Sequence, residues 1–245
     1  ENTSLPFSNN GKLSINVTEK QTAPDESSLI YSPECLAVGI GCERNVTTEE
    51  VFDLVKTTLS KHTLCPDSVA IIVSIDLKMD EEALQQLSLK LKKPLRFFNA
   101  AVLELETPRL LNPSNIVFNE VGCHGVAEAA ALAAAGPDGE LIVPKEKSKR
   151  ATCAIAKAPN ILVPEKIGLE RGKLFIIGTG PGKKGWLTPE ANELISFTSD
   201  LVGYKLYLDL LGNATSGKTL HPYELGEERD RVLRALDIAA DGKTV

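Results

Sequence analysis

The sequence lacks the features that mark membrane-spanning, disulfide-stabilised or nucleic-acid-binding proteins. No apolar run in its 245 residues is long enough to cross a bilayer, and the polar first 20 residues do not resemble a signal peptide. The five cysteines are odd in number and form no C-x-x-C pair, which argues against a disulfide framework or a zinc knuckle. Neither side of Lys173 carries an excess of basic residues. We therefore expect a cytoplasmic protein that binds no nucleic acid, no membrane and no metal.

The composition is that of an ordinary globular protein. Hydrophobic residues make up 42% and charged residues 24%, which suits one large domain or two small ones. Residues 1–32 lack periodicity and are rich in Ser, Asn and Thr. We interpret them as a linker or flexible tail, with one extended segment at residues 13–17. Because the chain opens at Glu1, we expect it to be cut from something longer.

Strands and helices alternate over residues 33–158. Apolar runs at 35–41, 69–76 and 94–99 are typical of buried strands, and amphipathic stretches at 49–61, 80–93 and 126–136 predict helices. Two further strands are expected at 140–144 and 151–158. This alternation predicts an α/β/α layer domain with a largely parallel sheet.

A linker at 159–172 separates this domain from a second α/β unit at 173–245. The second unit begins with an expected strand at 173–177 and a glycine-rich turn, and a helix with Pro189 in its first turn follows. A short strand over 201–204 and a long amphipathic helix over 223–243 complete it. Because it ends on its second or third strand, we expect a partial subdomain.

The glycine-rich turn, G-T-G-P-G at residues 178–182, leaves alternatives open. By itself it can be a tight turn that lets the backbone pass another element. A dinucleotide-binding fingerprint would need G-x-G-x-x-G opening a helix, and Pro181 interrupts that pattern. A nicotinamide-binding protein is the weaker alternative, and it predicts a retained cofactor.

The wider string around this turn resembles the N-terminus of the tetrapyrrole methylases, and within them precorrin-3B C(17)-methyltransferase. The match covers residues 173–211 through G-x-G-P-G, through L-T-P-x-A at 187–191 and through V-G-Y-x-x-Y at 202–207. The resemblance implies ring methylation and contraction with S-adenosylmethionine as methyl donor. It implies these cofactor-binding residues: Gly178, Gly180, Pro181, Gly182 and Tyr204.

The second unit departs from that family in two places. Lys183 stands where an Asp usually follows G-P-G, and the later G-D-P-G segment that helps to hold the donor does not occur before Val245. We therefore expect this chain alone to bind the donor poorly and to be inactive as a methyltransferase. The resemblance also implies a possible homodimer.

Residues 35–158 resemble the C-terminal domain of cobalt-precorrin-5A hydrolase and a related small protein of the aerobic cobalamin pathway. The resemblance lies in ordered blocks such as LAVGIGCERN, SIDLKMDEEAL, VGCHGVAEAAALAAAG and ATCAIAKA. Both resemblances imply corrin-ring biosynthesis, with tetrapyrrole or corrinoid intermediates as ligands. The alternative is a non-catalytic scaffold that binds a corrinoid and delivers it.

The hydrolase opens a δ-lactone on ring A and releases a two-carbon aldehyde, which needs an activated water and a donor for the developing oxyanion. The polar residues near predicted strand ends are the candidates, because open α/β sheets bind ligands there. Asp76 and Lys78 should share a face, as should His124 and Glu128 if the helix begins early enough. The catalytic candidates are Asp76, Lys78, His124, Glu128 and Lys145. Each can equally be a solvated turn residue or a local salt-bridge partner, and Cys42 is a weak candidate nucleophile.

Overall fold

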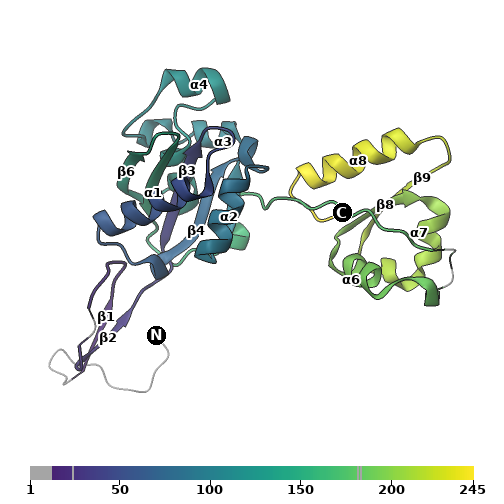
Figure 1. Cartoon of the computed structure of the whole chain (residues 1–245), viewed down its shortest axis with the longest axis horizontal. Helices are drawn as coiled ribbons and strands as arrows, with labels where there is room; N and C mark the ends of the chain where they lie inside the picture. The colour runs from purple at the N-terminus through teal and green to yellow at the C-terminus, as the bar shows by residue number, and fades with distance from the viewer. Residues whose placement is uncertain (1–12, 24, 181, 183) are drawn as a thin grey trace. The chain divides into compact units, whose positions relative to one another are not determined.

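The computed structural model describes residues 13–23, 25–180, 182 and 184–245, and these form two compact units that divide between Gly168 and Leu169 (Figure 1). Each unit is described by itself. Within these ranges no helix is both long and apolar enough to cross a membrane.

The first unit is built on one five-stranded sheet. Its strand order is β5-β4-β3-β7-β6. The strands are β3 (Leu36–Cys42), β4 (Val69–Ile75), β5 (Leu95–Phe98), β6 (Glu140–Lys147) and β7 (Ala151–Lys157). β3, β4 and β5 are parallel, and β7 runs antiparallel to both of its neighbours. β6 therefore points the same way as β3, β4 and β5, and the prediction of a largely parallel sheet is confirmed.

Helices cover both faces of this sheet, as the α/β/α prediction requires. Helices α1 (Thr48–Lys61) and α2 (Glu82–Leu91) pack on one face. Helices α3 (Ala100–Glu104) and α5 (Ala127–Ala135) pack on the other. α1 begins where the sequence predicts, because the Thr47 hydroxyl accepts a hydrogen bond from the Glu50 amide and caps the helix.

The alanine-rich helix α5 lies unusually close to β3. A Cβ atom at Gly39 would stand 1.9 Å from the Ala127 carbonyl oxygen, and one at Gly41 would stand 3.4 Å from the Val126 Cβ. The small side chains of both elements allow this approach. As a result, the start of α5 lies beside the end of β3.

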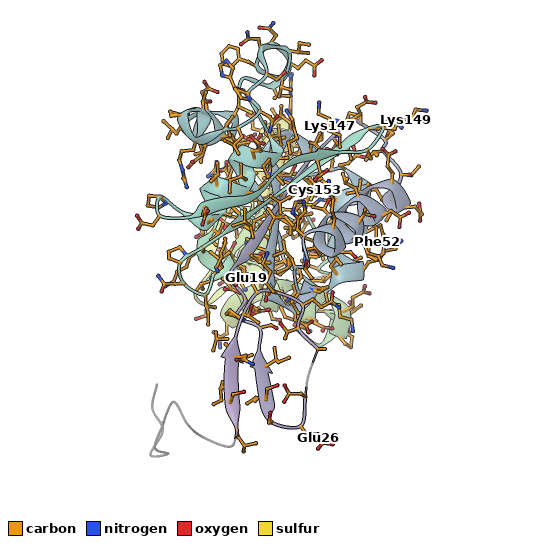
Figure 2. The ribbon with its side chains drawn as sticks, turned by 90° about the vertical axis from the view of Figure 1, so that its left-hand side faces the viewer. Glu19, Glu26, Phe52, Lys147, Lys149 and Cys153 are labelled. Carbon is orange, nitrogen blue, oxygen red and sulfur yellow. The ribbon has the colours of Figure 1, made fainter. Side chains whose placement is uncertain are left out.

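Helices α3 and α4 (Asn115–Val121) and strand β2 (Ser28–Tyr31) were not predicted from the sequence, whereas strand β1 (Ser14–Val17) lies in the extended segment expected at 13–17. Helix α4 has no buried residue, and its N-terminus is capped by Ser114. Strands β1 and β2 form a parallel two-stranded ribbon within the segment interpreted as a linker, and Glu26 lies near its far end (Figure 2). Residues 1–12 and 24 of that segment lie outside the described residues.

Part of the segment interpreted as the 159–172 linker packs against the first unit. The Leu162 amide donates a hydrogen bond of 2.9 Å to the Glu34 carbonyl, and Leu162 and Ile167 pack on the core beside α5. Gly168 takes a left-handed conformation, where a Cβ would stand 2.6 Å from the Phe97 carbonyl oxygen. This part of the segment is ordered by contacts that its irregular sequence, without helix or strand periodicity, does not reveal.

The second unit is small. Helices α6 (Pro189–Phe197), α7 (Lys205–Leu211) and α8 (Glu228–Ala240) accompany the parallel strands β8 (Asp200–Tyr204) and β9 (Thr219–Tyr223). Its buried core cluster is Ile195, Leu201 and Leu208. Of the apolar residues of α8, Ile238 is buried, while Val232, Leu233 and Leu236 are exposed.

The strand predicted at 173–177 is wrong, and β9 was missed. Lys173 forms a single parallel bridge with Thr244, and Phe175 donates a backbone hydrogen bond to Val245. Residues 176–178 are not in a strand within the described part of the chain, because the short 243–245 segment pairs no further along. An apolar run makes a strand only where a partner strand supplies its hydrogen bonds.

Candidate functional site

The candidate site lies where β3, β4 and β5 end, which is also where α5 begins. We call this region the carboxyl edge, and define it as residues 42–45, 76–81, 99–105, 110–126 and 145–150. In an open α/β sheet the ends of parallel strands are where ligands usually bind. Four of the five catalytic candidates of the sequence lie within these ranges, with Lys145 near the end of β6, and Glu128 lies in the first turn of α5.

A carboxylate–imidazole pair is the main ionisable feature of the edge. The Nδ1 atom of His124 lies 2.9 and 3.0 Å from the two carboxylate oxygens of Glu104, at the end of α3. The Glu104 carboxylate also accepts a hydrogen bond of 3.0 Å from the His124 backbone amide. The histidine is thus held both by its ring and by its backbone.

The ring of His124 is fixed further by an aromatic contact. Phe118, on α4, stacks on it with ring centroids 4.5 Å apart and an interplanar angle of 25°. The His124 carbonyl accepts a hydrogen bond of 2.7 Å from the Ser114 amide, just before α4. The described residues offer its Nε2 atom no hydrogen-bond partner, and the side chain is one-quarter exposed.

Glu104 is ionised in this setting. Partial burial raises the pKa of its carboxyl, but hydrogen bonds from the His124 amide, the Thr107 hydroxyl and the His124 ring outweigh burial and lower the pKa overall. A carboxylate can only accept hydrogen bonds, so Nδ1 of His124 donates. The neutral ring then carries its free lone pair on Nε2.

Glu104 was not found from the sequence. It stands in the string L-E-L-E-T-P beside Glu106, and neither glutamate has a spacing that singles it out. Its relation to His124 spans 20 residues and arises because α3 directly follows β5, while His124 directly precedes α5.

The expected shared face of Asp76 and Lys78 is wrong. β4 ends at Ile75, and residues 76–78 form a 3₁₀ turn, in which residues two apart do not face the same way. Burial raises the pKa of the Cys123 thiol, and the charges of Glu104 and Asp76 add to that effect, while the charge of Lys78 opposes the burial that raises the pKa of Cys42. Asp76 thus acts on the residue beside His124, and Lys78 acts on the last residue of β3.

The expected shared helix face of His124 and Glu128 is also wrong. α5 begins at Ala127, so His124 precedes the helix. Glu128 is 2% exposed and accepts hydrogen bonds of 2.8 to 2.9 Å from four donors: the amides of Leu111, Asn112 and Lys145, and the Asn112 side chain. Burial raises its pKa, but these hydrogen bonds lower it overall. A carboxylate with four donors is suited to holding a loop, and poorly suited to accepting a further proton.

Lys145 contacts the same loop. Its Nζ atom donates a hydrogen bond of 2.9 Å to the Asn112 carbonyl, and burial together with the charge of Lys147 lowers its pKa despite the nearby Glu128. Lys147 ends β6, and Lys149 lies in the turn between β6 and β7 (Figure 2). The edge thus carries several cationic side chains.

Cys42 does not fit the role of a nucleophile. Burial raises the pKa of its thiol to about 11, and the cations Lys78, Arg44 and Arg150 do not offset that effect. The thiolate is the reactive form of cysteine, so the side chain is inert near neutral pH.

Exposed apolar side chains surround these polar groups. They belong to the turn after β4, to α3 and α4, and to the loops beside these two helices, and are Leu77, Val102, Leu105, Leu111, Ile116 and Phe118. Ile116, on the short helix α4, is 73% exposed. A cluster of exposed apolar residues around ionisable groups is typical of a ligand-binding surface.

The second unit has a cavity of about 550 Å³. Gly178, Gly180 and Tyr204 line it, as three of the five predicted cofactor-binding residues. Gly182 lines a separate small pocket beside Leu210, and Pro181 lies outside the described residues. Gly180 and Gly182 take left-handed conformations, which explains glycine at both positions.

S-adenosylmethionine fits this cavity only in part. The donor carries a sulfonium, an ammonium and a carboxylate, whereas Arg231 is the one charged side chain among the described residues that line the cavity. No acidic side chain of that lining is available for the two cationic groups. Elsewhere too, no three His, Cys, Asp or Glu side chains of the described chain are grouped to hold a metal ion.

Comparison with known proteins gives relatives for the first unit. Residues 36–156 match the family model described as cobalamin synthesis G C-terminus. The chain is 43% identical over 131 residues to protein CobE of Sinorhizobium sp., which covers 54% of this chain and 84% of that protein. It is 32% identical over 134 residues to cobalt-precorrin-5A hydrolase of Priestia megaterium, which covers 55% of this chain and 35% of that protein.

The remaining part of the chain has relatives of its own. It is similar to precorrin-3B C(17)-methyltransferase of Sinorhizobium sp., with 38% identity over 74 residues, which covers 30% of this chain and 29% of that protein. The chain therefore spans about a third of the hydrolase and less of the methyltransferase.

Proposed function

We propose, from the premise that this chain belongs to the cobalamin synthesis G C-terminal family, that its first unit binds a tetrapyrrole intermediate of cobalamin biosynthesis at the carboxyl edge and opens a lactone on it. The substrate class follows from the relative named cobalt-precorrin-5A hydrolase. A lactone carbonyl needs an activated water to attack it and a donor for the oxyanion that develops.

One observation carries this proposal: the Glu104–His124 pair lies beside exposed apolar side chains of α3 and α4. A macrocycle of this class has a broad apolar body and peripheral carboxylates. The exposed side chains of Leu105, Ile116 and Phe118 are suited to contact the apolar body of the macrocycle. The cations Lys78 and Lys147 are suited to bind its carboxylates. The edge therefore offers apolar contact, cationic contact and proton transfer together.

The test uses the full chain with cobalt-precorrin-5A under anaerobic conditions. We expect a stoichiometric two-carbon aldehyde, detected by its reduction with alcohol dehydrogenase and NADH. Visible absorbance of the macrocycle reports binding in the same sample. Binding without aldehyde would contradict lactone opening.

A second function is favoured by one specific observation. Glu128 and Lys145, two of the five catalytic candidates, use their hydrogen bonds to hold the 111–112 loop. A site whose polar groups are engaged in this way suits a non-catalytic module that binds a corrinoid and delivers it. This module would show tight binding and no aldehyde in the same experiment.

The second unit we assign to part of a methyltransferase of the same pathway. Its similarity to precorrin-3B C(17)-methyltransferase and the glycine-lined cavity support this assignment. Because the described residues that line the cavity include no acidic side chain for the donor, we expect equilibrium dialysis with labelled S-adenosylmethionine to show no saturable binding up to millimolar concentration. Saturable binding at micromolar concentration would contradict this expectation.

A further inference from the structure

His124 differs from the other two histidines of the chain in which nitrogen is engaged. His62 uses Nε2 toward Glu146, and His221 uses Nε2 toward the buried Asp200. His124 instead uses Nδ1 toward Glu104. The nitrogen at the tip of the ring therefore stays available in His124 and is engaged in the other two.

The contacts of His124 fix its position and the orientation of its ring, and they leave Nε2 available for proton transfer. Glu104 binds both its amide and its ring, the Ser114 amide binds its carbonyl, and Phe118 stacks on one face of the imidazole. An ion pair that serves only a structural role at a surface requires no more than the contact between its two charged groups, and it contributes little to stability. Four contacts on one partly exposed histidine are the arrangement expected of a preorganised base.

We propose that His124 is the general base of the carboxyl edge and that Glu104 is the positioning residue that sets its tautomer and orientation. This inference rests on the proposed lactone opening. Neither the family model nor the relatives assign a role to either residue.

The chemical step balances with water as the co-reactant. Nε2 of His124 takes a proton from water as the water oxygen bonds to the lactone carbonyl carbon. The tetrahedral intermediate then collapses, its ring C–O bond breaks, and the proton on Nε2 passes to the departing alkoxide. The products of this step are a carboxylic acid, which ionises in solution, and an alcohol, and His124 returns to its starting state. The alcohol then gives its proton to water as the C–C bond that joins it to the macrocycle breaks, which releases the two-carbon aldehyde and leaves the electron pair in the conjugated ring.

One further charged group acts near this pair. Burial raises the pKa of the adjacent Cys123 thiol, and the charges of Glu104, on α3, and of Asp76, after β4, add to that effect. The Glu104 carboxylate, which contacts the ring directly, favours the cation that forms when Nε2 accepts a proton.

The decisive experiment compares His124→Gln, Glu104→Gln and Glu104→Asp in the full chain, with His62→Gln as the matched control. We expect His124→Gln to lower the rate of aldehyde release by about 10²- to 10⁴-fold, the usual contribution of a general base, with substrate binding retained. Glu104→Gln should lower it by about tenfold or more, because the neutral amide no longer fixes the tautomer. Glu104→Asp should recover part of this loss, and His62→Gln should leave the rate unchanged.

The outcomes separate this inference from the proposed function. If the wild-type chain releases no aldehyde, the proposed function fails and the general base fails with it. If the wild type releases aldehyde and His124→Gln does so at the same rate and with the same pH profile, the general base alone is overturned.

A second measurement does not depend on turnover. The ¹⁵N chemical shifts of the imidazole, assigned with the three single-histidine variants, should show the proton of neutral His124 on Nδ1. Glu104→Ala should move that population toward Nε2. A wild-type ring with its proton on Nε2 would overturn the positioning role of Glu104.

Discussion

The buried carboxylate of Glu128 joins three segments of the first unit through four hydrogen bonds. A Gln side chain at this position presents an NH₂ group to donors that need an acceptor. We expect Glu128→Gln to destabilise the first unit by about 3 kcal/mol, the scale of losing charge-assisted hydrogen bonds in a buried site. Hydrogen exchange of the peptides over 108–114 and 140–147 should increase at pH 7.

The same residue predicts an acid sensitivity. The folded pKa of Glu128 lies below its ordinary value of 4.5, so its contribution to stability is fully present above that value and is lost as the pH falls through the folded pKa. Exchange in the two peptides should therefore increase below pH 4.5 in the wild type and change less in Glu128→Gln. Glu120→Gln, an exposed change on α4, is the control. Equal pH dependence in Glu128→Gln and the wild type would contradict this account.

Gly39 allows α5 to lie against β3. An Ala at this position places its Cβ 1.9 Å from the Ala127 carbonyl oxygen, a contact that only a backbone shift can relieve. We expect Gly39→Ala to cost about 3 kcal/mol or to abolish folding of the first unit, as severe overpacking does. Gly185→Ala, where a Cβ meets no atom within 4 Å, should change stability by less than about 0.5 kcal/mol. Circular dichroism melts of the two variants give the comparison, and equal melts would contradict it.

Part of the candidate site could be predicted from the residues alone. The sequence placed His124 just before a strongly helical run, and α5 begins three residues after it, at Ala127. It could not pair His124 with Glu104, because the contact depends on how α3 and the loop before α5 meet in space. It also could not show that Glu128 is saturated by hydrogen bonds, because three of its four donors are backbone or side-chain groups of residues 111 and 112.

At the scale of elements, periodicity predicted those that bury a face and missed those that do not. α1, α2 and the strands β3 and β4 carry long apolar patterns, and their positions agree with the sequence. α4 buries no residue, so it has no amphipathic pattern to detect, and it is defined by its Ser114 cap and the left-handed Gly122 at its end. β9 contains Pro222 and forms an edge strand, where a proline is tolerated.

Helix α4 should contribute to binding and not to stability. Ile116 is 73% exposed, so Ile116→Ser should change the unfolding free energy by less than about 0.5 kcal/mol. If the macrocycle lies against α4, the lost apolar contact should weaken its binding by about 1 kcal/mol, or about fivefold. Absorbance titration with cobalt-precorrin-5A measures the change. Leu89→Ser, on an equally exposed position near the end of α2, should leave binding unaltered, and equal affinities for the two variants would exclude α4 from the site.

At the scale of the whole molecule, the two units differ in how much core they possess. The first unit has two extensive buried clusters, one on each face of its sheet. The second has a buried cluster of three residues, and much of the apolar surface of α8 is exposed. Stability rises with the fraction of surface that folding buries, so the second unit should be the less stable one.

This difference predicts two separate unfolding transitions, which fluorescence and circular dichroism together can resolve. Trp186, the single tryptophan of the chain, lies in the second unit, so tryptophan fluorescence reports that unit. Far-ultraviolet circular dichroism mostly reports the larger first unit. In urea we expect the fluorescence midpoint to precede the main circular dichroism midpoint, because the unit with the smaller core should be the less stable one. Glu128→Gln should then lower the second midpoint and leave the fluorescence midpoint unchanged. Coincident midpoints in the wild type, moving together in the variant, would show that the two units unfold as one cooperative structure.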